Sequence, residues 1–317
     1  MNDTILSVSR LTAGYKGRAA VADISFDLSH GGILCLVGES GCGKSTLLKA
    51  LISSPEVTIQ SGGITLDGTE VTVLSQKARE QRCRDKMGMV FQNPGAAFNP
   101  IRTYRAQFKE TLKSHNKYDA ALFEEQAAGA LAKLELQEGV ALLRKCPYEL
   151  SGGMNQRMLL SLAMLLGQDI LLCDEPTSAL DATIQLQVAR ELKNLRDKSG
   201  ITLIVVTHSL ALAGFLADRI GVMYAGRLVE LGETDDLLSD PVHPYTKSLI
   251  AAIPSLDGHM PQGLAGQPPL SGPAENGCEF SDRCPYAREE CSDVRYELRQ
   301  VSERHFSACP YGKGAAV

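Results

Sequence analysis

The stretch VGESGCGKSTLL, from Val37 to Leu48, decides the fold class of this chain. Three glycines in it precede a leucine-rich segment that begins at Lys44, and residues 38–45 match the pattern G-x-x-x-x-G-K-[ST]. Successive backbone N–H groups have to turn inward to surround a chain of phosphates, and a Cβ at the glycine positions would obstruct them. A helix that begins near Lys44 would also point the positive end of its dipole at the same anion. The stretch therefore predicts a nucleotide-binding loop.

Side chains from this loop and from one later segment predict a site for ATP and Mg²⁺. Lys44 would reach the β- and γ-phosphates, and the Ser45 hydroxyl would ligate Mg²⁺. The segment ILLCDEP (170–176) places two carboxylates at the end of an apolar run. Asp174 would hold Mg²⁺ through water, and Glu175 would accept a proton from the water that attacks the γ-phosphate. The loop residues predicted to bind ATP are Gly38, Ser40, Gly41, Cys42, Gly43, Lys44, Ser45 and Thr46.

Short apolar runs predict buried strands at 31–38, 87–92, 169–175 and 202–208. The last two runs are each followed by a helical pattern, and the pattern at 182–200 has an apolar stripe. Continuously apolar strands that alternate with helices are typical of a parallel sheet covered on both faces. Together with the loop, this order predicts an α/β fold of the P-loop NTPase class.

The segment LSGGMNQR (150–157) narrows this class, because it resembles the signature motif of the ATP-binding subunits of ABC transporters. Ser151 can cap the helix that follows, and the unobstructed N–H groups of Gly152 and Gly153 can form a second anion site. In that family these residues and the glutamine, here Gln156, face the γ-phosphate held by the loop of another subunit. The resemblance therefore implies a dimer.

The remaining positions that the family uses can be assigned one at a time. Tyr15 lies where the family stacks an aromatic ring on adenine, and Gln92 lies where its Q-loop glutamine contacts Mg²⁺ and the attacking water. Asp181, in SALD (178–181), corresponds to the D-loop aspartate at the dimer interface. His208 corresponds to the switch histidine that senses the γ-phosphate. A single histidine at a strand end is more often structural, but here the resemblance implies a catalytic role.

The resemblance extends over residues 5–235 and implies a RecA-like core of the ABC ATPase type. Between 93 and 150 the sequence is rich in alanine, leucine and glutamate, which predicts a helical insertion. We expect the core to comprise residues 1–92 and 161–235, and a helical subdomain with the signature motif to comprise 93–160. Residues 236–317 would form a C-terminal extension that contains cysteines.

Two further segments indicate a subfamily. FQNPGAAFNP (91–100) and DPVHPYTKSLIAAIP (240–254) resemble the oligopeptide, dipeptide and nickel importers. The second segment also predicts a short helix entered through a proline. In these importers two related ATPase subunits usually pair. The resemblance implies an ATPase that closes around two ATPs and drives import of peptides or nickel through two permease subunits, supplied by an extracytoplasmic binding protein.

Composition agrees with a soluble subunit that reaches a membrane through partners. The 317 residues contain 37 acidic and 32 basic side chains, and this acidic balance argues against nucleic acid as a partner. The longest apolar run, 158–167, is about half the ~20 residues that a bilayer requires. Any link to a membrane must therefore go through a partner, and the resemblance to the importers implies a place at the cytoplasmic face of a bacterial inner membrane. A soluble ABC ATPase of repair or translation, and a regulatory cassette that does not hydrolyse ATP, are the alternatives.

The nine cysteines fall into two groups. Five are scattered over the first 173 residues, and Cys42 among them lies in the phosphate-binding loop. Positive charge there could favour its thiolate, but the preferred interpretation is that this cysteine merely replaces a serine. The other four have the spacing C-x5-C-x6-C-x17-C. Four thiolates are the usual ligands of a [4Fe–4S] cluster or of Zn²⁺, and the wide spacing and Cys-Pro steps favour the cluster. Free thiols in a small packed segment are the third possibility. These four cysteines are Cys278, Cys284, Cys291 and Cys309.

Overall fold

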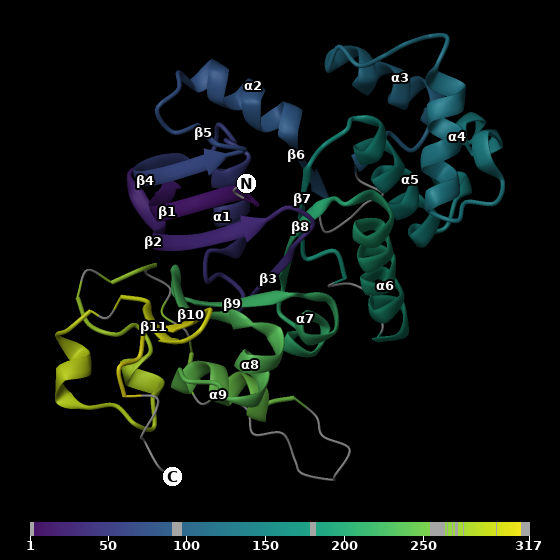
Figure 1. The fold of residues 1–317 in the computed structure, drawn as a ribbon. Coiled ribbons are helices and arrows are strands. Elements are labelled where there is room, and N and C mark those ends of the chain that lie inside the picture. The colour runs from purple at the N-terminus through teal and green to yellow at the C-terminus, as the bar shows by residue number, and fades with distance from the viewer. Residues whose placement is uncertain are drawn as a thin grey trace.

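The computed structural model describes most of the chain. The described residues are 3–90, 97–177, 182–253, 264, 266, 267, 269, 272–274, 276–295 and 297–311, with 182–184 described by their backbone alone. They form a sheet of eight strands and a sheet of four, and a group of helices stands apart at one end (Figure 1).

The larger sheet has the strand order β11-β12-β10-β9-β3-β8-β7-β6, and its strands from β9 to β6 run parallel. The four apolar runs predicted as strands correspond to β3, β6, β7 and β8, so these predictions are confirmed, although residues 91 and 92 lie outside the described part. The strands of this sheet are β3 (Ile33–Val37), β6 (Met87–Val90), β7 (Ile170–Asp174), β8 (Thr202–Thr207), β9 (Arg219–Tyr224), β10 (Arg227–Glu233), β11 (Arg299–Ser302) and β12 (His305–Ser307).

Strand β3 shows why the apolar runs are continuous. All five of its residues are buried, and successive side chains point to opposite faces of the sheet. Leu34 and Leu36 belong to one hydrophobic core, whereas Ile33, Cys35 and Val37 belong to another. The parallel sheet therefore has a core on each face, as the sequence predicted.

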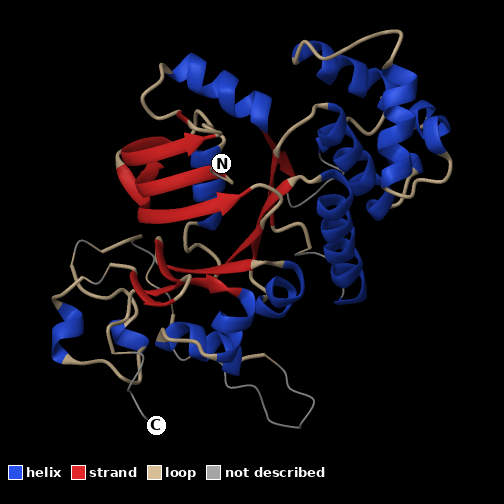
Figure 2. Cartoon of the chain, in the orientation of Figure 1, coloured by secondary structure: helices blue, strands red, loops and turns tan. Residues whose placement is uncertain are grey.

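The first core lies between the parallel strands and the smaller, antiparallel sheet, whose order is β2-β1-β4-β5 (Figure 2). Helix α1 (Lys44–Leu51) is in this layer and contacts strands of both sheets. Helix α2 (Gln76–Lys86) follows the antiparallel sheet and leads into β6. The four strands are β1 (Thr4–Tyr15), β2 (Arg18–Ser29), β4 (Thr58–Leu66) and β5 (Thr69–Glu70).

The second core is covered by helices that follow the parallel strands. Helix α6 (Ala182–Ser199) comes after β7, which confirms the helix predicted at 182–200, and α7 (Leu210–Leu216) comes after β8. Helix α8 (Thr234–Ser239) contacts α7 and the strand β10. Helix α6 thus connects β7 to its neighbour β8, and α7 connects β8 to β9, which lies on the other side of β3. Crossover connections of this kind are what parallel strands require.

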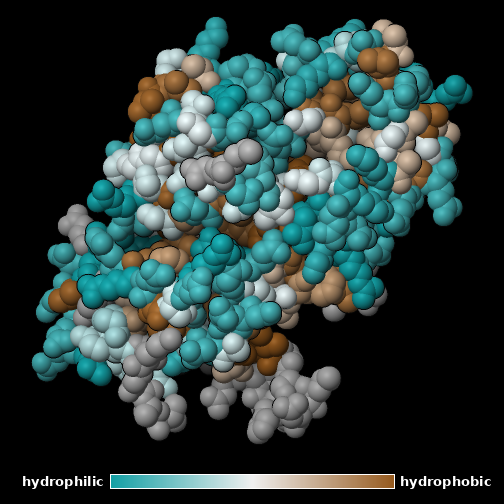
Figure 3. Space-filling view, viewed as in Figure 1, coloured by the Kyte–Doolittle hydropathy of each residue, from teal (hydrophilic) through white to brown (hydrophobic). Residues whose placement is uncertain are grey.

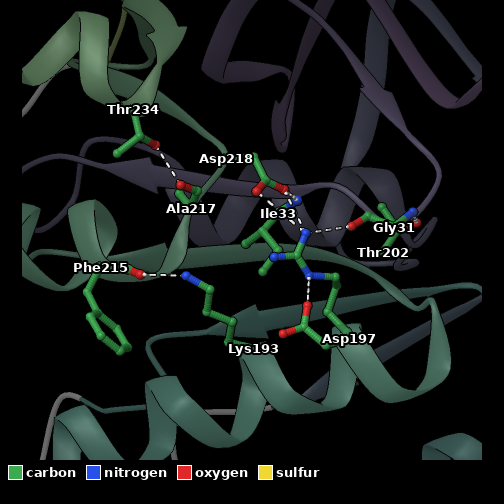
Figure 4. A network of polar contacts seen from close by, with 10 residues as sticks. Gly31, Ile33, Lys193, Asp197, Thr202, Phe215, Ala217, Asp218 and Thr234 are labelled. Atoms are coloured by element: carbon green, nitrogen blue, oxygen red, sulfur yellow. Dashed lines mark hydrogen bonds and ion pairs between the residues drawn. The ribbon is translucent and has the colours of Figure 1, made fainter.

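The ends of β3 and β8 that lie away from the phosphate-binding loop are held by polar contacts (Figure 4). Asp218 accepts a hydrogen bond from the Ile33 N–H at 2.8 Å and pairs with Arg196 at 3.3 Å. The Thr202 hydroxyl accepts from the Gly31 N–H at 3.0 Å. These contacts give hydrogen-bond partners to backbone N–H groups at the N-terminal ends of the strands. They stabilise the sheet whose C-terminal strand ends position the site.

The predicted helical insertion is present and has a core of its own. An aromatic cluster of Phe98, Tyr104 and Phe108 lies at its centre. Its last helix, α5, crosses the boundary predicted at residue 160, so that boundary does not coincide with the end of an element. The helices of this region are α3 (Tyr104–Ser114), α4 (Phe123–Lys133), the 3-10 helices η2 (Gly139–Arg144) and η3 (Pro147–Glu149), and α5 (Gly152–Leu165).

The C-terminal extension continues the larger sheet. Strand β12 pairs antiparallel with β10, where Leu231 lies opposite Phe306, and β11 completes a hairpin at the sheet edge. The short helix predicted after a proline is α9 (Pro244–Ala251). The 3-10 helix η4 (Ser281–Arg283) ends just before Cys284, and the 3-10 helix η5 (Glu289–Ser292) contains Cys291. The extension is therefore integrated into the core, which the sequence did not indicate.

The surface in Figure 3 is mostly hydrophilic, and hydrophobic side chains gather on the helical region at the upper right. Within the described ranges, no helix combines the length and the apolar character that a membrane span needs.

Candidate nucleotide-binding site

The phosphate-binding loop connects the end of β3 to the start of α1, and its course requires glycine. A Cβ at Gly38 would lie 2.2 Å from the carbonyl oxygen of Met223, and one at Gly43 would lie 2.8 Å from that of Ala20. Gly41 has a φ of 82°, in the left-handed region that other residues rarely adopt. The loop is therefore held against β9 and β2 in a path that only bare backbone can follow.

Lys44 lies inside this loop and is 4% exposed. Its Nζ donates to the carbonyl oxygens of Gly38 at 2.8 Å and Glu39 at 2.9 Å. Carbonyl oxygens have only partial negative charge, so these bonds orient the ammonium without neutralising it. The loop thus has a fixed positive charge at the N-terminus of α1, where the helix dipole also favours an anion. This arrangement fits a polyphosphate.

Two oxygen ligands meet at the edge of the parallel sheet where the loop begins. The Ser45 hydroxyl donates to Asp174 Oδ1 at 2.8 Å, although 129 residues separate them. Ser45 is exposed, and Asp174 ends β7, two strands away from β3. Burial raises the pKa of Asp174, and the hydrogen bond from Ser45 partly offsets that effect. A hydroxyl and a carboxylate side by side fit a hard cation such as Mg²⁺.

Glu175 and His208 lie beside this pair. Glu175 Oε2 is 3.6 Å from His208 Nδ1, and the two residues follow the neighbouring strands β7 and β8. Glu175 has a φ of 46° and its N–H donates to Val206 at 3.0 Å, so its backbone is held in an uncommon conformation by the adjacent strand. The structure therefore brings a carboxylate and a histidine to the same sheet edge as Ser45 and Asp174.

The segment 151–153 forms the exposed N-terminus of α5. Ser151 accepts a hydrogen bond from the Met154 N–H at 3.3 Å, so the predicted cap is confirmed. A Cβ added to Gly152 or Gly153 would meet nothing within 4 Å. Packing among the described residues therefore does not require glycine at these two positions.

Gln156 differs from these three residues because it is 2% exposed. The prediction that its side chain reaches a nucleotide held by another subunit does not fit this burial. One turn into α5, the helix face at Gln156 packs against the protein, so the signature segment presents its backbone and Ser151 instead.

Tyr15, at the end of β1, is 37% exposed and lies close to the loop. Its hydroxyl is 3.3 Å from the Thr46 hydroxyl on α1. The ring is therefore available beside the phosphate-binding loop, where the sequence predicted an adenine contact. Gln92 and Asp181 lie outside the described residues.

Comparison with known proteins extends this geometry to the whole chain. The family model described as ABC transporter matches residues 21–178, and the model described as the oligopeptide/dipeptide transporter C-terminal region matches 229–291. The oligopeptide transport ATP-binding protein AppF of Bacillus subtilis is 35% identical, over 92% of this chain and 88% of that protein. The chain belongs to the ABC transporter ATP-binding proteins. A Brucella ovis protein whose provisional name is peptide import ATP-binding protein is 37% identical, over 96% of this chain and 97% of that protein.

Solved structures agree with this assignment. An ATP-binding cassette solved as a dimer in a post-hydrolysis state with ADP and Pi has a TM-score of 0.60 and 26% identity, over 72% of this chain and 98% of that chain. For cbiO1 of Clostridium perfringens, a part of an ABC transporter complex, the TM-score is 0.67 at 23% identity, over 75% and 92% of the two chains. The chain is an ABC ATPase, and ATP with Mg²⁺ fits its loop and its Ser45–Asp174 pair.

The four C-terminal cysteines of this ABC ATPase line one cavity of about 30 Å³. The Phe280 N–H donates to the Cys278 sulfur and the Tyr286 N–H to the Cys284 sulfur, while burial raises the pKa of Cys278 to about 12 and also raises that of Cys284. Within the described residues, no group of three or more His, Cys, Asp or Glu is placed to hold a metal ion. The thiols converge, but their present spacing does not fit a metal centre.

Cys42 is not the readily ionised thiol that the secondary hypothesis described. It is 4% exposed, and burial raises the pKa of its thiol although Lys44 beside it acts in the opposite direction. The hypothesis of a readily ionised cysteine was wrong, because the loop folds the side chain inward, away from water. The burial agrees with the preferred interpretation, a small side chain in place of a serine. Cys42 contributes its small side chain and its backbone to the loop.

Sequence reasoning missed the buried carboxylate that joins the extension to the sheet. Glu230 in β10 is 0% exposed and accepts from the N–H groups of Val242 at 2.7 Å and His243 at 2.9 Å. Its Oε1 is also 2.8 Å from Nε2 of His305 in β12. No short pattern could have indicated this, because the partners lie 12 to 75 residues from Glu230.

Proposed function

We propose that this ABC ATPase drives the import of peptides through a membrane permease. The observation that supports this most directly is the match of residues 229–291 to the oligopeptide/dipeptide transporter C-terminal region. Relatives named for oligopeptide transport and peptide import cover nearly the full chain. Nickel, which related importers transport, is the second candidate cargo.

Reconstitution with a peptide permease and a peptide-binding protein from the same organism tests this function. Peptides should accumulate in vesicles only with ATP on the side of the ATPase, and addition of peptide-loaded binding protein should stimulate hydrolysis. Accumulation of Ni²⁺ without peptide uptake would favour the second cargo. Absence of any coupling to a permease would contradict the proposal.

Each residue at the sheet edge has a defined task in hydrolysis. Lys44 would bind the β- and γ-phosphates, and Ser45 and Asp174 would hold Mg²⁺, which neutralises phosphate charge when bound. Glu175 would accept the proton of the attacking water, and His208, at 3.6 Å from it, would position that carboxylate and respond to the γ-phosphate. Gln92 is proposed as a further contact to Mg²⁺ and water.

We propose that two ATPase subunits complete each other's sites. The exposed glycines at 152 and 153 have free space beside them, and α5 packs with α4 in the helical region. The signature segment would then bind the nucleotide of a related, non-identical subunit, with Asp181 across the same interface. Hydrolysis would remove the phosphate contact that holds the faces together.

The pairing can be tested with a substitution that should disturb the interface between subunits but not the fold of the single chain. In a Glu175→Gln background, Gly153→Val should abolish the ATP-dependent dimer in size-exclusion chromatography. Gly129→Val is the matched control, because Gly129 is also an exposed helical glycine with nothing within 4 Å of an added Cβ. Equal loss of dimer in both variants would contradict a specific role for the signature segment.

The helical region, residues 93–160, is proposed to contact two permease subunits at the cytoplasmic face of the bacterial inner membrane. Ile101 is 78% exposed and Tyr148 is 71% exposed, both on this region, where Figure 3 shows hydrophobic side chains gathering. Ile101→Ser with Tyr148→Ser should weaken co-purification with the permease but leave ATP binding intact. Val73→Ser, on the core and 73% exposed in the wild type, is the control.

The other two subdivisions of the chain, residues 1–92 with 161–235 and residues 236–317, are proposed as the nucleotide-binding core and the extension. A soluble ABC ATPase of repair or translation would remain in the soluble fraction without permease. A regulatory cassette would bind ATP without turnover. Fractionation and steady-state ATPase measurements distinguish these alternatives.

We also propose that Cys278, Cys284, Cys291 and Cys309 form a [4Fe–4S] site of structural role, with Zn²⁺ as the alternative. Their convergence on one cavity and the two N–H groups that face sulfur support this. The thiols would have to rearrange around a ligand. Protein purified without oxygen should contain about four irons and four sulfides per chain. Colourless protein with stoichiometric zinc would favour the alternative, and metal-free protein would contradict both.

A further inference from the structure

We propose that Arg283 of the C-terminal extension is a positioning residue for ATP binding, because it neutralises and holds Glu39 of the phosphate-binding loop. This inference rests on the proposed role of the loop in binding ATP. It assigns to the extension a part in the nucleotide site, in addition to its place at the edge of the sheet.

The contact between the two residues is a bidentate ion pair. Arg283 Nη1 is 2.7 Å from Glu39 Oε2, and Nη2 is 3.0 Å from Oε1, although 244 residues separate them in the sequence. The arginine side chain is 5% exposed and that of the glutamate is 27% exposed. Paired, planar geometry of this kind is more specific and stronger than an exposed ion pair.

The backbone of Glu39 is held by two further residues. Its N–H donates to the Tyr245 hydroxyl at 3.1 Å, and its carbonyl accepts from Lys44 Nζ at 2.9 Å. Tyr245 belongs to α9, at the start of the extension. The extension therefore contacts both the side chain and the backbone of one loop residue, and that residue in turn orients the lysine that would bind phosphate.

The guanidinium of Arg283 is itself held in place by a cluster of aromatic side chains. It lies 5.7 Å from the ring centre of Tyr224 and donates to that residue's hydroxyl at 3.1 Å. Tyr224, Tyr245 and Phe280 pack on one another with centroid distances of 4.7 to 5.4 Å. Since Phe280 and Arg283 are in the cysteine segment, folding of that segment determines where the positive charge is placed.

Electrostatics gives this contact a consequence for nucleotide binding. A carboxylate within the loop would repel the several negative charges of ATP at short range. Arg283 offsets that charge and keeps the carboxylate on the side of the loop that faces the extension. By linkage, ATP binding should stabilise the extension by the same factor by which the extension favours ATP.

Substitution of each partner separates this effect from general destabilisation. Arg283→Gln should weaken binding of MgATP to the purified full-length chain about tenfold in calorimetry. Adding Glu39→Gln should recover most of that loss, because it removes the unneutralised carboxylate. Arg283→Lys, which keeps the charge but not the bidentate geometry, should give an intermediate affinity.

Arg304→Gln is the matched control. Arg304 also pairs from the extension to the core, with Glu233 at 3.3 Å, but it contacts the far end of β10 and not the loop. Its substitution should leave MgATP affinity unchanged. Unchanged affinity in Arg283→Gln, or a double variant that is weaker than Arg283→Gln alone, would overturn the inference. Failure of the wild-type chain to bind MgATP would instead contradict the proposed function.

Discussion

The phosphate-binding loop and the C-terminal cysteine segment are both organised around a motif, but they acquire their geometry differently. The motif of the loop is eight consecutive residues, 38–45, which follow one strand and include the first two residues of one helix, and its glycines determine the backbone path directly. The four cysteines are distributed over residues 278–309 and reach one cavity only because η4, η5 and the hairpin β11–β12 bring them there. A motif of consecutive residues specifies its own shape, whereas a dispersed one depends on the rest of the fold.

The comparison also shows that the two regions are connected. The loop residue Glu39 contacts Arg283 and Tyr245, and the buried Glu230 contacts His305 in the terminal hairpin. Consecutive sequence fixes the path of the loop, and long-range contacts fix its surroundings. The following predictions test how far each region depends on the other.

The largest effect is expected at the catalytic carboxylate. Glu175→Gln should lower ATP turnover at least about 100-fold, because no general base would accept the proton of water, while MgATP binding persists. Steady-state phosphate release and calorimetry measure the two quantities. Glu135→Gln, at an exposed residue paired with Lys198, is the control. Unchanged turnover would show that the sheet edge does not contain the base.

The next effect concerns the junction of core and extension. Glu230→Gln should lower the free energy of unfolding by about 2 kcal/mol, because a buried carboxylate with three hydrogen-bond partners would become neutral and lose acceptor capacity. Urea unfolding measures this. Glu233→Gln, at the partly exposed end of the same strand, should have a much smaller effect. Equal stability of both variants would separate the extension from the core.

A smaller effect is expected for the magnesium site. Ser45→Ala should raise the Mg²⁺ concentration required for half-maximal ATPase activity about tenfold, because one oxygen ligand is lost while Asp174 remains. Ser45→Thr keeps the hydroxyl and should behave as the wild type. A magnesium requirement that does not change in Ser45→Ala would argue against this assignment.

The smallest effect is a pH dependence that belongs to the extension. Burial lowers the pKa of His243 to about 4, so the unfolded state binds a proton first as the pH falls below about 6.5. Between pH 7 and pH 5.5 the wild type should therefore lose about 1 kcal/mol of stability more than His243→Asn, whose side chain can still accept from the Tyr245 N–H. Urea unfolding at both pH values measures the difference. A parallel pH dependence in both proteins would contradict it.

Much of the candidate nucleotide-binding site, and of the strands that position it, could be predicted from the sequence. The apolar runs gave β3, β7 and β8, and the resemblance to ABC ATPases placed Asp174, Glu175 and His208, which the structure brings to one edge. The exposed side chain predicted for Gln156 and the reactive thiol considered for Cys42 are the exceptions. Both were assigned by position in a motif, and neither position shows whether a side chain points outward. Burial of each is decided by the elements that pack against it.

The sequence alone determined the phosphate-binding loop, the order of strands and helices and the cap of α5, because these depend on backbone preferences and on contacts a few residues apart. Only the tertiary structure decided that β12 joins β10, that four distant thiols line one cavity and that Arg283 reaches Glu39 across 244 residues. Contacts of that kind form only when the whole sheet is folded, since no local interaction brings such distant segments together.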